Sequence, residues 1–106
     1  MTRAATLVSL VALAAAYCPG AAAARTHDAV IDQLKFGPLP AVLKRGDRIR
    51  WINRDLFRHS VTARDGSFDL DLPAGKSGAV VLKQAGTIRY FCKYHPGMTG
   101  SLAVKP

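Results

Sequence analysis

The sequence predicts an all-β domain, an antiparallel Greek-key β-sandwich of about eight short strands. Short segments alternate between apolar and polar side chains with the period of two that is typical of strands. Turn residues, mainly Gly, Pro and Asp, separate these segments at the close spacing seen in sandwiches. No segment after residue 24 shows the apolar periodicity of a helix.

Four strands are expected in the first half of the domain, each followed by a turn or loop: 28–36, 41–44, 48–54 and 58–63. The third of them alternates Ile49 and Trp51 with arginines, which predicts one buried and one solvated face. The fourth carries His59. Both Trp51 and the later Phe68 are predicted to lie in the core.

Four further strands are expected in the second half, at 67–70, 78–83, 87–92 and 101–105. In 87–92 the residues Ile88, Tyr90 and Cys92 fall on one face. The period of a strand therefore directs the Cys92 sulfur inward, at one end of the sandwich.

Residues 1–24 have the pattern of a secretory signal peptide. A positive start is followed by an apolar stretch from Ala4 to Ala16 and by small residues up to Ala24. The apolar stretch is short for a membrane span, and a retained anchor is the alternative. Cleavage after Ala24 leaves one domain, 25–106, predicted to be periplasmic or secreted, monomeric and without a membrane span.

The charge of the chain favours acidic partners or anionic surfaces. The net charge is +8, and residues 25–106 keep +7 because residues 1–24 hold one Arg and no acid. No basic-aromatic motif of a nucleic-acid-binding protein is present. Five arginines form either a solvated strand face or a docking surface for an acidic partner: Arg48, Arg50, Arg54, Arg58 and Arg64.

Four residues form a candidate metal site. Cys92, His95 and Met98 follow one another with C-x-x-H-x-x-M spacing, and His59 lies upstream. One thiolate, two imidazoles and one thioether are the ligand set of a blue, type 1 copper site. Cys92 is the only cysteine of residues 25–106, so no internal disulfide can form, and metal ligation explains a lone cysteine in an oxidising compartment.

Several motifs together resemble the cupredoxin, or blue copper protein, family, and within it the amicyanin and plastocyanin groups. The motifs are Gly46-Asp47, Trp51-Ile52-Asn53-Arg54-Asp55, His59, Gly86-Thr87, Tyr90-Phe91-Cys92 and His95-Pro96-Gly97-Met98. The resemblance covers nearly all of residues 28–105. It implies one type 1 copper per chain, with His59, Cys92 and His95 as equatorial ligands and Met98 as the weak axial ligand.

Two positions depart from the family pattern. Ser60 stands where these carriers usually have Asn, a residue that ties the two ligand loops together by hydrogen bonding. Lys93 stands where they usually have Thr or a small residue, which places a cation beside the thiolate. Both departures leave the tuning of the site open.

The sequence therefore predicts a periplasmic electron carrier, not an enzyme, that shuttles single electrons between redox proteins. The exposed ligand is expected to be His95, ringed by apolar groups such as Pro96, Phe36 or Leu39, with Phe91 as a second contact. A copper-storage or delivery protein is the alternative. A nucleophilic Cys–His pair, a zinc site and a metal-free adhesion domain explain fewer of the residues.

The new N-terminus is a second candidate metal site. If the chain begins at Arg25, the tripeptide Arg25-Thr26-His27 offers an amine, two amides and an imidazole, a square-planar set that Cu(II) accepts. The alternative is a disordered tail with an accidental histidine.

Overall fold

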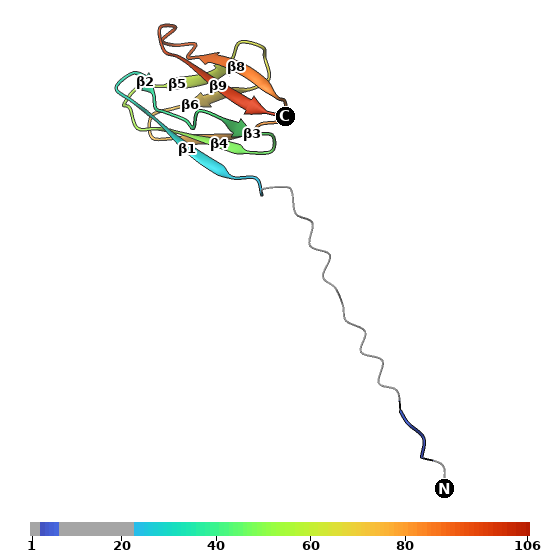
Figure 1. The fold of residues 1–106 in the computed structure, drawn as a ribbon. Coiled ribbons are helices and arrows are strands. Elements are labelled where there is room, and N and C mark those ends of the chain that lie inside the picture. Colours follow the sequence, from blue (N-terminus) through green and yellow to red (C-terminus); the bar gives the residue numbers. More distant parts are fainter. Residues whose placement is uncertain (1–2, 7–22) are drawn as a thin grey trace.

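The computed structural model describes residues 3–6 and 23–106, and all regular structure in these ranges is β (Figure 1). The nine strands are β1 (Thr26–Asp32), β2 (Lys35–Phe36), β3 (Leu43–Lys44), β4 (Arg48–Asn53), β5 (His59–Ala63), β6 (Asp69–Leu72), β7 (Ser77–Val81), β8 (Gly86–Phe91) and β9 (Thr99–Lys105). The all-β prediction is confirmed, with most strand limits within two or three residues of those expected.

Two sheets form the layers of the sandwich. One has the strand order β2-β1-β4-β7 and the other the order β3-β9-β8-β5-β6. The pairs β1–β4 and β3–β9 are parallel, and the remaining pairs are antiparallel. Between β1 and β4 the chain crosses to the second sheet and forms β3, so β4 returns beside β1 in the same direction.

Alternation along the strands places the core between the two sheets. In β4, Ile49 and Trp51 are fully buried, whereas Arg48 and Arg50 are exposed. The Trp51 ring lies 5.6 Å from Phe68 and 5.6 Å from Tyr90, between ring centroids. The prediction that Trp51 and Phe68 belong to the core is confirmed.

The expected strand 28–36 is instead a hairpin, β1–β2. Its two turn residues, Gln33 and Leu34, have φ angles of 51° and 59°, and Ile31 pairs with Phe36 across the turn. Positive φ at both central positions of a two-residue turn is usual for Asn-Gly and costly for larger side chains. The alternation continues through the turn, so the sequence pattern alone does not reveal it.

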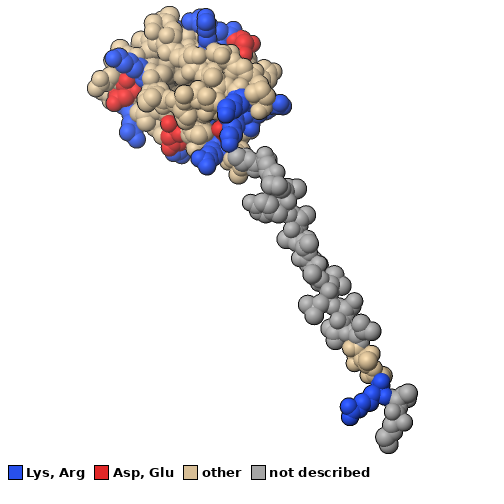
Figure 2. All heavy atoms as spheres, viewed as in Figure 1, with Lys and Arg blue, Asp and Glu red and all other residues tan. Residues whose placement is uncertain are grey.

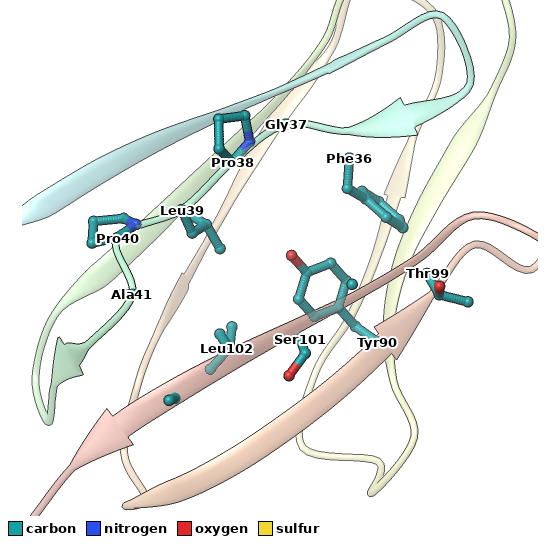
Figure 3. Close-up of a pocket in the computed structure, with 12 residues that line it drawn as sticks. Phe36, Gly37, Pro38, Leu39, Pro40, Ala41, Tyr90, Thr99, Ser101 and Leu102 are labelled. Atoms are coloured by element: carbon teal, nitrogen blue, oxygen red, sulfur yellow. The ribbon is translucent and has the colours of Figure 1, made fainter.

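Phe36 and Leu39 line a shallow pocket beside β8 and β9, away from the candidate metal ligands. Figure 3 shows the Tyr90 ring lying between the 36–41 segment and β9. The pocket has a volume of about 310 Å³ and none of the four candidate ligands lines it. The Phe36 ring packs edge-on against Tyr90, with centroids 5.0 Å apart.

The expected signal peptide falls mostly on residues 7–22, which lie outside the described residues. Among the described residues, no helix is long and apolar enough to cross a membrane. The first strand begins two residues earlier than predicted, because β1 already includes Thr26 and His27.

Candidate metal centre

Three of the four predicted ligands meet at one end of the sandwich. The Cys92 Sγ lies 3.8 Å from the His59 Nδ1 and 3.9 Å from the His95 Nδ1. The side chains of His59 and Cys92 are fully buried, whereas His95 is half-buried. We call this end of the domain the metal end.

Strand pairing explains how residues 33 positions apart become neighbours. Strands β5 and β8 are adjacent and antiparallel, with Thr62 opposite Phe91. His59 at the start of β5 and Cys92 just after β8 therefore arrive at the same end. The buried positions alternate in β8, which directs Cys92 inward as predicted.

A tight loop delivers the other two residues. The Met98 N–H donates to the His95 carbonyl at 2.8 Å, and the Cys92 N–H donates to the Met98 carbonyl at 3.1 Å. These two bonds close the loop after β8 and hold Met98, which is buried, beneath it. The structure thus brings the donor atoms of His59, Cys92 and His95 together and places the backbone of Met98 next to them.

Asp55 orients the ring of His59. The His59 Nε2 donates to the Asp55 Oδ2 at 2.7 Å, which leaves the Nδ1 to face the Cys92 sulfur. Burial opposes ionisation of Asp55, but hydrogen bonds from the Leu34 N–H, from His59 and from the Gln33 N–H outweigh it and lower its pKa. A carboxylate on the remote nitrogen fixes the tautomer and raises the basicity of a ligating imidazole.

The unusual turn between β1 and β2 holds Asp55 in place. The Gln33 N–H donates to the Asp55 Oδ1 at 2.7 Å, and the Leu34 N–H donates to Oδ2 at 3.0 Å. Both amides point to one carboxylate because both residues adopt the left-handed conformation. Asp55 was not predicted to have a role at the site; its signals in the sequence are its place at the end of a family-like motif and its position four residues before a candidate ligand histidine.

Ser60 connects the two ligand segments despite its short side chain. Its N–H donates to the Cys92 Sγ at 3.3 Å, and its Oγ accepts the Lys93 N–H at 2.8 Å. The Lys93 ammonium turns away from the sulfur and pairs with Asp69 at 2.9 Å. The two departures from the family pattern therefore leave the thiol held by a backbone donor and without a free cation beside it.

The surface around His95 differs from the one expected. Phe57, on the β4–β5 loop, lies 6.0 Å from the His95 ring between centroids, and its neighbour Leu56 is 92% exposed. The expected Phe36 and Leu39 instead pack against the core. Phe91 is half-buried beneath the Arg64 guanidinium, 4.6 Å from its ring centre, so it is not a bare contact residue.

The donor atoms fit a copper ion in a trigonal site. Three donors that each lie about 2.0–2.3 Å from a shared ion in one plane are about 3.7 Å apart. The two sulfur–nitrogen distances, 3.8 and 3.9 Å, match that value. One thiolate with two imidazoles and a nearby thioether is the donor set of type 1 copper.

Comparisons with known proteins agree with this chemistry. A family model described as a Cupredoxin-like domain matches residues 4–104. Amicyanin of Paracoccus versutus is 30% identical over 96 residues, which span 82% of this chain and 73% of that protein. An oxidized methionine-to-leucine mutant of amicyanin superimposes with a TM-score of 0.65 at 26% identity, covering 74% of this chain and 80% of that one.

A second solved structure, the reduced Cu(I) form at pH 4 of a proline-to-glycine mutant of amicyanin, has a TM-score of 0.65 and 27% identity. It covers 82% of this chain and 87% of that one. The fold, the donor set and these matches define a blue copper electron-transfer protein with copper as its cofactor. The chain belongs to the cupredoxin family.

The segment Arg25-Thr26-His27 does not have the open arrangement that a terminal copper site needs. Thr26 and His27 pair with Arg48 and Ile49 in the parallel β1–β4 ladder. The His27 Nε2 donates to the Asp47 Oδ2 at 3.1 Å. The segment is thus neither a disordered tail nor free to wrap a metal while β1 is paired.

Proposed function

We propose that this protein is an exported, periplasmic type 1 copper protein that carries single electrons between redox partners. His59, Cys92 and His95 would hold the copper ion, with the Met98 thioether as a weak fourth ligand. The observation that carries the proposal is the triangle of donor atoms, with Cys92 Sγ within 3.9 Å of both ring nitrogens, at the end of a rigid sandwich.

The side chains around the site suit a change of oxidation state without rearrangement. Copper, when bound, supplies the Cu(I)/Cu(II) couple. His59 is fixed by Asp55, Cys92 by the Ser60 N–H, and the loop of His95 by the Met98 N–H. Because these contacts come from the protein itself, the donor positions are set before and after an electron passes.

Electrons enter and leave through the half-buried His95 in this proposal. The Phe57 ring contacts it, and the large exposed side chains from this end of the domain are Leu34, Leu56, Phe57 and Tyr94, which are 44%, 92%, 57% and 47% exposed; the Tyr94 hydroxyl donates to Asp71. A small apolar patch around a ligand allows brief docking with little area buried. The partner is therefore a redox protein with an apolar surface of its own, and this chain acts as a monomer.

Charge contributes to docking less than the arginine count suggests. Arg50 pairs with Asp28, and Arg58 pairs with Asp71. Arg54 is exposed beside the apolar patch and takes part in no ion pair among the described residues. An acidic rim on the partner would face Arg54, and electron transfer between the two would slow as salt rises.

Electron self-exchange between the reduced and oxidised protein tests the function. We expect rapid exchange. Leu56→Asp should slow it, because the new carboxylate would have to be buried in the apolar contact between the two molecules. Val42→Asp is the matched control: Val42 is 50% exposed but precedes β3, away from the metal end. Slow exchange in the wild type, together with ready release of copper to a chelator, would favour storage or delivery instead.

Export is tested separately. We infer that residues 1–24 are removed on secretion, because a positive start, an apolar stretch and small residues precede Arg25. Mass spectrometry of the protein from the periplasmic fraction should give a chain that begins within a residue or two of Arg25. A chain that retains Met1 and fractionates with membranes would contradict this and indicate an anchor.

A further inference from the structure

Exposed cations gather at the end of the domain opposite the metal end. Six of them define what we call the basic end: Arg25, Lys44, Arg45, Arg48, Lys83 and Lys105. Figure 2 shows several Lys and Arg side chains gathered on the domain beside its N-terminal residues, with an acidic group visible next to them. None of the six takes part in an ion pair within the part of the chain that the structure describes.

A single buried carboxylate draws these segments together. The Asp47 side chain accepts hydrogen bonds from the Arg25 N–H at 3.0 Å and from the Lys44 N–H at 3.1 Å. The Asp47 carbonyl accepts the N–H of Leu82, the neighbour of Lys83, at 2.8 Å. Asp47 is 3% exposed, and its carboxylate is hydrogen-bonded to the Arg25 and Lys44 amides and to the His27 ring rather than to the side chain of any of the six cations.

Strand pairing sets the positions of the other cations of the basic end. Lys44 and Lys105 are directly opposed in the β3–β9 pair, and Arg48 is opposed to Val81 in the β4–β7 pair. Directly opposed like charges such as Lys44 and Lys105 are unfavourable for stability. The fold thus places two exposed cationic residues opposite each other, and neither forms an ion pair among the described residues, which favours an anionic surface as their partner.

The chain enters the domain at this same end. Ala24 lies close to Gly46 in the β3–β4 turn. A Cβ atom added to Gly46 would be 3.8 Å from the Ala24 Cβ. The apolar stretch from Ala4 to Ala16 precedes it in sequence. If residues 1–24 act as the signal peptide proposed above, the basic end is the part of the domain nearest the membrane until they are cleaved.

Apolar side chains accompany the cations. Val42, just before β3, is 50% exposed, and Val81, opposite Arg48, is 42% exposed. Cations mixed with a few apolar side chains are the composition that binds anionic lipid headgroups at an interface. Strand β9 has seven residues and runs from the metal end to Lys105, so the two ends are about 20 Å apart.

We propose that the basic end binds the anionic surface of a phospholipid bilayer and that the bound protein presents its metal end to the aqueous phase. The attraction is electrostatic and reversible, with each cation near the surface contributing about fivefold to binding. The protein would move along the membrane surface while His95 stays accessible to partners. This proposal uses the export of the chain but does not depend on the identity of the bound metal.

Binding to vesicles tests the proposal. The secreted protein, with its N-terminus checked by mass spectrometry, is mixed with phosphatidylcholine vesicles that contain or lack phosphatidylglycerol. We expect binding only with phosphatidylglycerol, weakening as salt rises. The triple variant Lys44→Glu, Arg45→Glu, Lys83→Glu should bind at least about a hundredfold more weakly, because three contacts are lost.

A matched triple variant separates the basic end from net charge. Lys35→Glu, Lys76→Glu and Arg89→Glu change exposed cations without ion pairs among the described residues and give the same net charge. This control should keep most of the vesicle binding. Absence of wild-type binding, or equal losses in the two variants, would overturn the proposal.

Two further measurements fix the orientation and the partner. Vesicle-bound protein should exchange electrons with a small water-soluble oxidant as fast as free protein does, because the metal end faces away. A marked slowing on the vesicle would overturn that orientation. If the first triple variant instead keeps vesicle binding but loses binding to an acidic redox protein, the basic end is a protein-docking surface and the lipid proposal is wrong.

Discussion

Single residues decide how the His59 ring is held. Its Nε2 meets Asp55 at 2.7 Å, and the same carboxylate accepts two amides from the β1–β2 turn. The turn residues Gln33 and Leu34 adopt positive φ, a conformation that costs about 1–3 kcal/mol for a residue other than Gly. The strain is offset by the hydrogen bonds to Asp55, so the hairpin and the metal end stabilise each other.

Removing this carboxylate should weaken metal binding. Asp55→Ala leaves the His59 Nε2 without its buried acceptor, and loss of such a partner lowers metal affinity by about 10–100-fold. Competition with a chelator would measure the Cu(II) affinity. Asp32→Ala is the control, because Asp32 also accepts the Gln33 N–H, at 3.0 Å, but makes no hydrogen bond to His59. Equal affinities of Asp55→Ala and wild type would contradict this role.

The candidate ligands could be predicted from the sequence because these side-chain types rarely occur together at this spacing. A thiolate, an imidazole and a thioether three residues apart have few other uses. The role of Asp55 could not be predicted, since it depends on a turn formed more than twenty residues earlier in the chain. Leu56 and Phe57 were missed for a similar reason: only the β4–β5 loop geometry brings Phe57 beside His95.

At the scale of elements, the β8–β9 pair supports both the core and the ligand loop. Tyr90 and Gly100 are directly opposed, and a Cβ on Gly100 would overlap the Tyr90 ring. The glycine therefore gives the ring space to lie flat over β9, where it contacts Phe36, Trp51 and Phe68. Cys92 follows two residues later on the same buried face.

Gly100→Ala should destabilise the domain. The added methyl group collides with the Tyr90 ring, and overpacking of this kind costs about 1–3 kcal/mol. Denaturant unfolding would measure the change in the free energy of unfolding. Ser101→Ala, one position along β9 and exposed, should change it by less than about 0.5 kcal/mol. If the two variants are equally stable, the close approach of Tyr90 does not constrain position 100.

Strands were predicted well where the alternation of apolar and polar residues was bounded by typical turn residues. Strand β4 shows Ile49 and Trp51 inside and Arg48 and Arg50 outside, as the pattern indicates. The β1–β2 hairpin was missed because Gln33-Leu34 lacks the Gly or Asn that normally marks such a turn. Sequence reasoning also gave no sign of the parallel pairs, which arise from the crossing of the chain between sheets.

At the scale of the whole molecule, charge and apolar surface are divided between two ends. The metal end carries Leu34, Leu56, Phe57 and Tyr94, and the basic end carries the cations around Asp47 that form no ion pair with any described residue. Composition predicted the excess of cations but not their position. Asp47 connects the start of β1, the β3–β4 turn and the residue after β7, and the hydrogen bonds from Arg25 and Lys44 lower its pKa to about 2.

The Asp47 carboxylate should make the stability of the domain depend on pH in the acid range. A group whose pKa is lower in the folded state stabilises it above the unfolded pKa of 3.8, and that contribution is lost as the pH falls toward about 2. Urea unfolding of the metal-free protein across this range should show the decline. Asp47→Asn should be less stable at neutral pH and should show a shallower decline. An identical pH profile for both proteins would contradict this.

The most direct measurement of the central claim is the visible spectrum of the protein with Cu(II). We predict an intense band in the orange-red from charge transfer between the Cys92 thiolate and copper, giving a blue or green protein. Cys92→Ser should abolish the band, and Met98→Gln should keep copper and lower its reduction potential because the weak axial ligand is replaced. A colourless Cu(II) complex of the wild-type protein would contradict the type 1 site and the electron-carrier function built on it.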